Sequence, residues 1–262
     1  MRLLKIVNMK ICIWCTESQK QKSFNDLAHS IPKSLGGKNI CENVCDDCNH
    51  YFGNINDRLR SIEETIKEVF YISRVRFLGK GKIGKNKPIA RIKSTYFNID
   101  IDKGKFSLKT KFTLTKDFQT NLCRQFKRGI YKIYLEELEI NKNVALDKEF
   151  DFIRSFAKDN LGDLPVFYFN RLHPIIALTE ESIANPSINF EYKTMNYLIQ
   201  NDVFFEFELL GQVFGIVRNK EWVKSFEDYI KENREIKKDY FSDIILINKV
   251  TDIDFTLNLF NN

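Results

Sequence analysis

Long apolar runs are absent from this sequence. No stretch of 18 apolar residues occurs, and charges interrupt the first ten residues, which therefore lack the apolar core of a signal peptide. There is also no internal repeat and no low-complexity tract. These absences argue against a membrane-spanning or secreted protein. We expect the chain to be cytoplasmic and to have no membrane partner.

Histidine is scarce, with only His29, His50 and His173 in 262 residues. Apolar residues make up 43% of the chain and aromatic residues 13%, including 23 phenylalanines. This composition is typical of a folded globular protein, and the length allows one or two domains with a substantial core.

Four of the six cysteines form two Cys-x-x-Cys pairs, Cys12 with Cys15 and Cys45 with Cys48, with 29 residues between the pairs. Each pair can chelate a metal through a short knuckle, and four thiolates make the closed tetrahedral site of a structural Zn²⁺. Cys41 and Cys123 remain as single thiols, which fits a reducing compartment. We therefore predict one structural zinc held by the four paired cysteines.

The cysteine pairs enclose a histidine motif, His29-Ser-Ile-Pro32 followed by Gly36-Gly37, and the second pair ends directly on Asn49. In these residues the sequence resembles the HNH endonucleases, in particular the branch whose ββα-metal fold is stapled by a four-cysteine zinc. The resemblance covers about residues 12–53. It implies a metal-dependent endonuclease that hydrolyses DNA phosphodiester bonds, most often in double-stranded DNA.

The resemblance also implies roles for single residues. His29 stands at the place of the general base, and an imidazole that titrates near pH 7 can take a proton from an attacking water. Asn49 stands where the family supplies a ligand to a catalytic Mg²⁺ or Mn²⁺, and an amide oxygen suits these hard cations. Asn43 matches the asparagine that braces the loop and orients the histidine.

One position departs from the family pattern. The residue before the histidine is usually an acid that binds the catalytic metal, and here it is Ala28. Asp26 is the nearest acid on the same alternating face, and we expect it to replace the missing ligand. His50, or water and phosphate together with Asn49, are the alternatives.

The pattern of apolar residues predicts an α+β fold. In the N-terminal part we expect a short strand in residues 1–11, a hairpin built from 26–31 and 40–44, and one amphipathic helix from residue 48 to about 70. The later elements are a hairpin of 89–102 with 106–114, helices over 116–139, 147–160 and 222–236, and strands between 164 and 216.

These elements suggest two domains. Residues 1–75 would form a zinc-stapled ββα-metal module, and residues 76–262 a mixed α+β domain of unknown family that serves target recognition or interaction. The Gly- and Lys-rich stretch 79–88 is the expected boundary.

Positive charge is concentrated near this boundary. Residues 71–115 contain twelve lysines and arginines against two aspartates, while the net charge of the whole chain is only +6. Such a block indicates a polyanionic partner, although a solvated loop and hairpin would have the same composition. With Lys33 and Lys38 near the hairpin turn, it would hold DNA phosphates independently of sequence.

Three functions are therefore compatible with the sequence. The first is an HNH endonuclease, in a setting such as restriction or phage defence and with homodimerisation as one arrangement. The second is a zinc protein that binds nucleic acid without cutting it, which Ala28 favours. The third is a nuclease subunit whose C-terminal region docks into a larger defence complex.

Overall fold

The computed structural model describes residues 9–54, 60–70, 95, 97–100, 105–110, 113, 115–172, 186–191 and 197–253. Helices and a four-stranded antiparallel sheet together make an α+β fold, as the sequence predicts. The expected boundary stretch 79–88, most of the basic block and residues 1–8 lie outside the described residues. The division into 1–75 and 76–262 therefore stays a prediction.

The N-terminal segment contains little regular strand. His29 and Ile40 form an isolated antiparallel bridge, and Lys33–Leu35 (η1) make a 3-10 turn between them. The hairpin predicted from residues 26–31 and 40–44 is thus reduced to a single bridge. Pro32, the N-cap of η1, has a fixed φ and no N–H to donate, so the chain turns there instead of continuing a ladder.

The single helix predicted from residue 48 to about 70 is wrong, because two helices share its amphipathic pattern. Helix α1 covers Asp46–Gly53 and ends where Asn54 becomes extended. Helix α2 covers Ile62–Val69, and the side chain of its N-cap Ser61 accepts a hydrogen bond from the Glu64 N–H. A serine in this position stabilises a new helix start more than a helix interior.

A long helix forms the centre of the molecule. Helix α4 covers Lys116–Lys142, with Thr115 as its N-cap and Asn143 in the left-handed conformation at its C-cap. The turn Lys148–Phe150 (η2) and helix α5, Asp151–Ala157, follow it. Strands β1, Phe97–Asp100, and β2, Lys105–Leu108, pair as an antiparallel hairpin within the range predicted from the sequence.

The four-stranded sheet has the order β4-β5-β3-β6, and all its pairs are antiparallel. Its strands are β3 (Val166–Arg171), β4 (Phe204–Leu209), β5 (Gln212–Val217) and β6 (Phe241–Leu246). Leu210 and Gly211 join β4 to β5 with positive φ at both positions, which matches the right-handed twist of the strands. The turn η3, Trp222–Ser225, and helix α6, Phe226–Lys237, connect β5 to β6.

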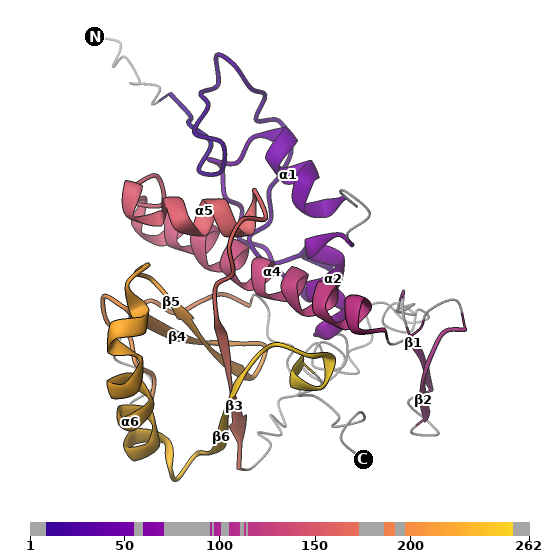
Figure 1. Cartoon of the computed structure of the whole chain (residues 1–262). Coiled ribbons are helices and arrows are strands. Elements are labelled where there is room, and N and C mark those ends of the chain that lie inside the picture. The colour runs from indigo at the N-terminus through magenta and orange to yellow at the C-terminus, as the bar shows by residue number, and fades with distance from the viewer. Residues whose placement is uncertain are drawn as a thin grey trace, which may run out of the picture.

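Helix α4 lies between the N-terminal segment and the sheet (Figure 1). Gly129 meets Ile66 of α2, and about one turn earlier in the helix the Phe126 ring packs 5.9 Å from that of Phe214 in β5. The buried apolar side chains of the described residues form one cluster that runs from Cys12 to Ile253. No helix among these residues has the length and apolar character needed to cross a bilayer.

Candidate active site and zinc centre

The two Cys-x-x-Cys pairs converge on one point. One pair precedes the His29 bridge and the other surrounds the start of α1, and all four Sγ atoms lie within 4.8 Å of one another. Three of the four side chains are buried, and the Cys45 N–H donates to Cys12 Sγ at 3.4 Å. This is the arrangement of a closed metal knuckle.

The chemistry of these thiols fits a dication. A hydrogen bond from Cys48 lowers the pKa of Cys12 to about 5, and the same contact raises the pKa of Cys48. Burial raises the pKa of Cys45 to about 12. Four thiols this close cannot all ionise without a positive ion, and Zn²⁺ provides that charge with tetrahedral geometry. The cluster is therefore compatible with a structural zinc.

His29 lies on the bridge that faces α4. Its side chain is half-buried, and its Nδ1 atom is buried without a hydrogen-bond partner among the described residues. Burial lowers the pKa of His29, and the positive charge of Lys33 lowers it further. The imidazole is therefore neutral at pH 7, which is the state that can accept a proton.

The two asparagines occupy different environments. Asn49 sits in the first turn of α1, half-buried, and its side chain forms no hydrogen bond within the described part of the chain. Asn43 precedes the second cysteine pair, and its Nδ2 donates to Glu139 Oε1 on α4 at 2.6 Å. Its observed partner is thus a residue far away in sequence.

Asp26 and His50, the two alternatives for the missing acid, contact each other. The distance from His50 Nε2 to Asp26 Oδ2 is 2.8 Å, and both side chains are exposed. The Asp26 N–H also donates to Asp46 Oδ1, which fixes the backbone at this point. Among the described residues, the four cysteines are the only group of three or more His, Cys, Asp or Glu side chains placed to share a metal ion.

A cavity of about 800 Å³ opens between η1 and the first turn of α2. Lys33 and Ser34 line one wall and Glu63, Glu64 and Lys67 the other. His29 is not among its lining residues, although two residues that shift its pKa, Lys33 and Glu63, are. The cavity therefore lies beside the histidine motif, and two lysines and two glutamates line it.

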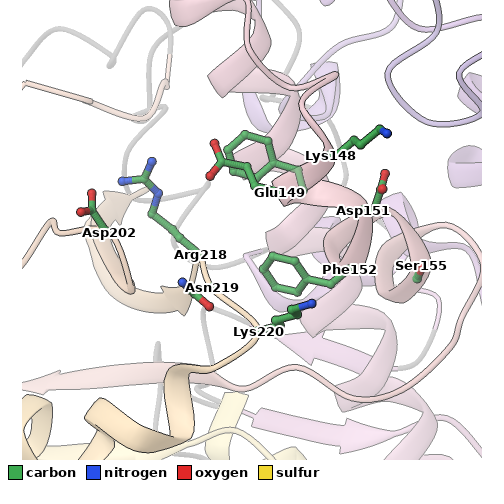
Figure 2. A pocket seen from close by; sticks show the side chains of 10 residues that line it. Lys148, Glu149, Asp151, Phe152, Ser155, Asp202, Arg218, Asn219 and Lys220 are labelled. Atoms are coloured by element: carbon green, nitrogen blue, oxygen red, sulfur yellow. The ribbon is translucent and has the colours of Figure 1, made fainter.

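A second cavity, of about 770 Å³, lies between α5 and the ends of β4 and β5 (Figure 2). Arg218 points towards Asp202 and Glu149, and its Nη1 donates to the Asn201 carbonyl at 3.1 Å. Three cationic and three carboxylate side chains line this cavity. Its walls therefore have no net charge that would select an anionic or a cationic ligand.

Helix α4 carries contacts that the sequence analysis missed. Five charged side chains on it are buried and contact the N-terminal segment: Arg128, Lys132, Glu136, Glu137 and Glu139. The signal in the sequence was their spacing, which puts four of them on one helix face. A charged stripe normally faces solvent, so this spacing alone does not indicate burial.

Comparison with known proteins agrees with this geometry. Residues 12–61 match the family model of the HNH endonucleases. The N-terminal segment is therefore of the HNH endonuclease type, which indicates a nuclease that acts on nucleic acid. The match is confined to this segment and does not reach α2 or α4. No curated protein and no solved structure matches the chain.

Proposed function

We propose that this protein is a metal-dependent endonuclease that cuts double-stranded DNA in the cytoplasm, in a restriction or phage-defence setting. The observation that carries the proposal is the combination of a four-cysteine centre with a neutral, half-buried His29, inside the segment that matches the HNH endonucleases. The uncharged single thiols Cys41 and Cys123, both buried, suit a reducing compartment.

In this mechanism His29 takes a proton from the water that attacks the phosphorus, and the bond to the 3′ oxygen breaks. Asn49 and Asp26 are the candidate ligands of one Mg²⁺ or Mn²⁺. When bound, the ion would polarise the phosphate and stabilise the charge on the leaving oxygen. Asn43 braces the loop through Glu139, and Lys33 holds a phosphate at the mouth of the 800 Å³ cavity.

DNA binding would draw on positive charge outside the site. The segment 71–115 has twelve cationic side chains, and phosphate contacts of this kind raise affinity without selecting a sequence. A homodimer or a defence-complex partner would use the α+β region.

The decisive test is cleavage of supercoiled plasmid DNA with Mg²⁺, Mn²⁺ or EDTA. We expect nicking with either metal and none with EDTA. His29→Ala should reduce the rate by about two to four orders of magnitude because it removes the base. His173→Ala is the matched histidine control. Wild-type cleavage by His29→Ala would contradict the proposal.

The metal ligands need a separate measurement. Asp26→Asn should weaken the apparent affinity for Mn²⁺, with partial recovery at high metal concentration. If Asp26→Asn does not change the metal dependence of cleavage, His50 becomes the candidate for the missing ligand of the catalytic metal. Ala28→Asp should raise activity if the catalytic ion lacks a ligand.

A second function remains because of Ala28: a zinc protein that binds DNA without cutting it. It predicts salt-dependent binding of DNA and no metal-dependent nicking. The plasmid assay separates the two.

A further inference from the structure

The hairpin leaves both backbone groups of His29, the N–H and the carbonyl, without a partner inside the hairpin. On either side of the His29–Ile40 bridge, the Ala28 carbonyl accepts from the Cys41 N–H at 2.9 Å and the Ser30 N–H donates to the Asn39 carbonyl at 3.2 Å. His29 and Ile40 therefore form the non-hydrogen-bonded type of antiparallel pair. In such a pair the carbonyl of His29 points away from the hairpin.

Lys132 of α4 binds this carbonyl. Its Nζ donates to the His29 carbonyl at 2.6 Å and lies 3.2 Å from the Ser30 carbonyl. The two residues are 103 positions apart in sequence. A buried carbonyl without a partner is unfavourable, so this contact fixes the peptide group that follows the His29 side chain.

The ammonium group is itself held on two other sides. Nζ lies 3.0 Å from Glu136 Oε2 as an ion pair and 3.1 Å from Glu63 Oε1 on α2. Burial lowers the pKa of Lys132, but the two carboxylates raise it by more than burial lowers it. The pKa of Lys132 therefore lies above its ordinary value. Trp14 Nε1 in turn donates to Glu136 Oε1 at 3.0 Å. Lys132 therefore remains charged while its side chain is only 2% exposed.

Neighbouring residues of the same helix extend this contact along the hairpin. Glu137 accepts hydrogen bonds from Ser30 Oγ and from Asn39 Nδ2, and Glu139 accepts from Asn43 Nδ2. These contacts hold both segments that flank the bridge against α4. They leave Lys132 as the side chain that contacts the backbone of His29 itself.

We propose that Lys132 is a positioning residue for His29, and that α4 is part of the nuclease site although it lies outside the family-matched segment. The inference rests on the proposed function of His29 as the base. By fixing the carbonyls of His29 and Ser30, Lys132 sets the direction in which the imidazole leaves the backbone. A misplacement of about 1 Å in a reacting group can cost about 100-fold in rate.

Lys127 provides a matched control on the same helix. It is equally buried, with a side chain 5% exposed, and its Nζ pairs with Asp163 at 2.6 Å instead of the hairpin. Lys132→Met and Lys127→Met both replace a buried ammonium by an unbranched apolar chain of similar length. Lys132→Arg retains the positive charge and the hydrogen-bond donors, so it tests whether these are enough to recover part of kcat.

The experiment compares these variants by plasmid cleavage and by histidine NMR, which is simple because the chain has three histidines. For Lys132→Met we expect kcat to fall about 10- to 100-fold with KM within about twofold and zinc retained. The His29 ring resonance should move while those of His50 and His173 stay. Lys127→Met should leave kcat and the His29 resonance unchanged, and Lys132→Arg should recover part of kcat.

Two results overturn the inference. One is a kcat for Lys132→Met equal to that of Lys127→Met, with an unmoved His29 resonance. The other concerns the wild-type protein and does not depend on how a variant folds: the absence of a nuclear Overhauser effect between the Lys132 ε-methylene and the Hα of His29 or Ser30.

The NMR arms also separate this inference from the proposed function. Full activity of His29→Ala would end the proposed function and, with it, the positioning role in catalysis. Inactive His29→Ala combined with an unmoved resonance in Lys132→Met would end the inference alone.

Discussion

At the residue scale, two features of the environment of His29 lower its pKa: burial and a nearby positive charge. Burial lowers its pKa first, and Lys33 in the following turn lowers it further by charge repulsion. A neutral imidazole is retained to lower pH than in a free histidine, whose pKa is about 6.5. The cost of this arrangement is a buried Nδ1 atom without a partner among the described residues.

We expect the acidic limb of the pH profile of kcat to lie below the ordinary pKa of histidine. Lys33→Gln removes a positive charge that disfavours protonation of His29, so this limb should move to higher pH. Lys38→Gln, across the same turn, is the control and should leave the limb in place. Profiles of kcat between pH 4.5 and pH 8.5 measure the shift, and a limb that moves down in Lys33→Gln would contradict the assignment.

At the element scale, α4 acts as the platform for both parts of the fold. Its charged face holds the hairpin, and Gly129 lets α2 approach closely. A Cβ at Gly129 would collide with Ile66 of α2, whose side chain is buried. Glycine normally weakens a helix by about 0.5–1 kcal/mol relative to alanine, so its presence here is explained by the contact between the two helices.

Gly129→Val should therefore lower the free energy of unfolding by about 1–3 kcal/mol through overpacking. Gly53→Ala is the matched control, because a Cβ there meets no atom closer than 3.9 Å, and it should leave stability unchanged or raise it by about 0.5–1 kcal/mol. Urea denaturation of both variants measures the difference. Equal stability of Gly129→Val and wild type would show that α2 does not pack on α4 as described.

At the scale of the whole molecule, the four-cysteine cluster and the sheet are connected through one core. Trp14 lies beside the first cysteine pair and packs its ring 4.7 Å from that of Phe52, while its Nε1 reaches Glu136. On the other side of the same helix, Tyr131 donates to the Pro165 carbonyl and accepts from the Val217 N–H. Loss of the metal should therefore affect more than the N-terminal segment.

Elemental analysis should find one zinc per chain, and Cys45→Ser should lose it. Because metal binding supplies folding free energy, we expect this variant to melt at a lower temperature, with loss of near-UV signal from the shared core. Cys123→Ser, a buried cysteine outside the cluster, is the control and should keep the zinc. Folded, soluble wild-type protein without zinc would contradict the prediction.

The sequence alone determined the local features of this protein. The spacing of the cysteines predicted the four-cysteine cluster, and the amphipathic pattern predicted α4 and α6, because both depend on residues close together in the chain. It missed the break between α1 and α2, where a capping serine interrupts an otherwise continuous apolar pattern.

Only the tertiary structure decided which surfaces meet. Lys132, Glu136 and Glu139 look like a solvated stripe in the sequence, since charged side chains are rarely buried without partners. Their partners lie about a hundred residues away, at His29, Trp14 and Asn43, and no local pattern records such pairings. The free energy of these contacts depends on desolvation and on satisfied hydrogen bonds, which exist only after α4 has packed against the hairpin.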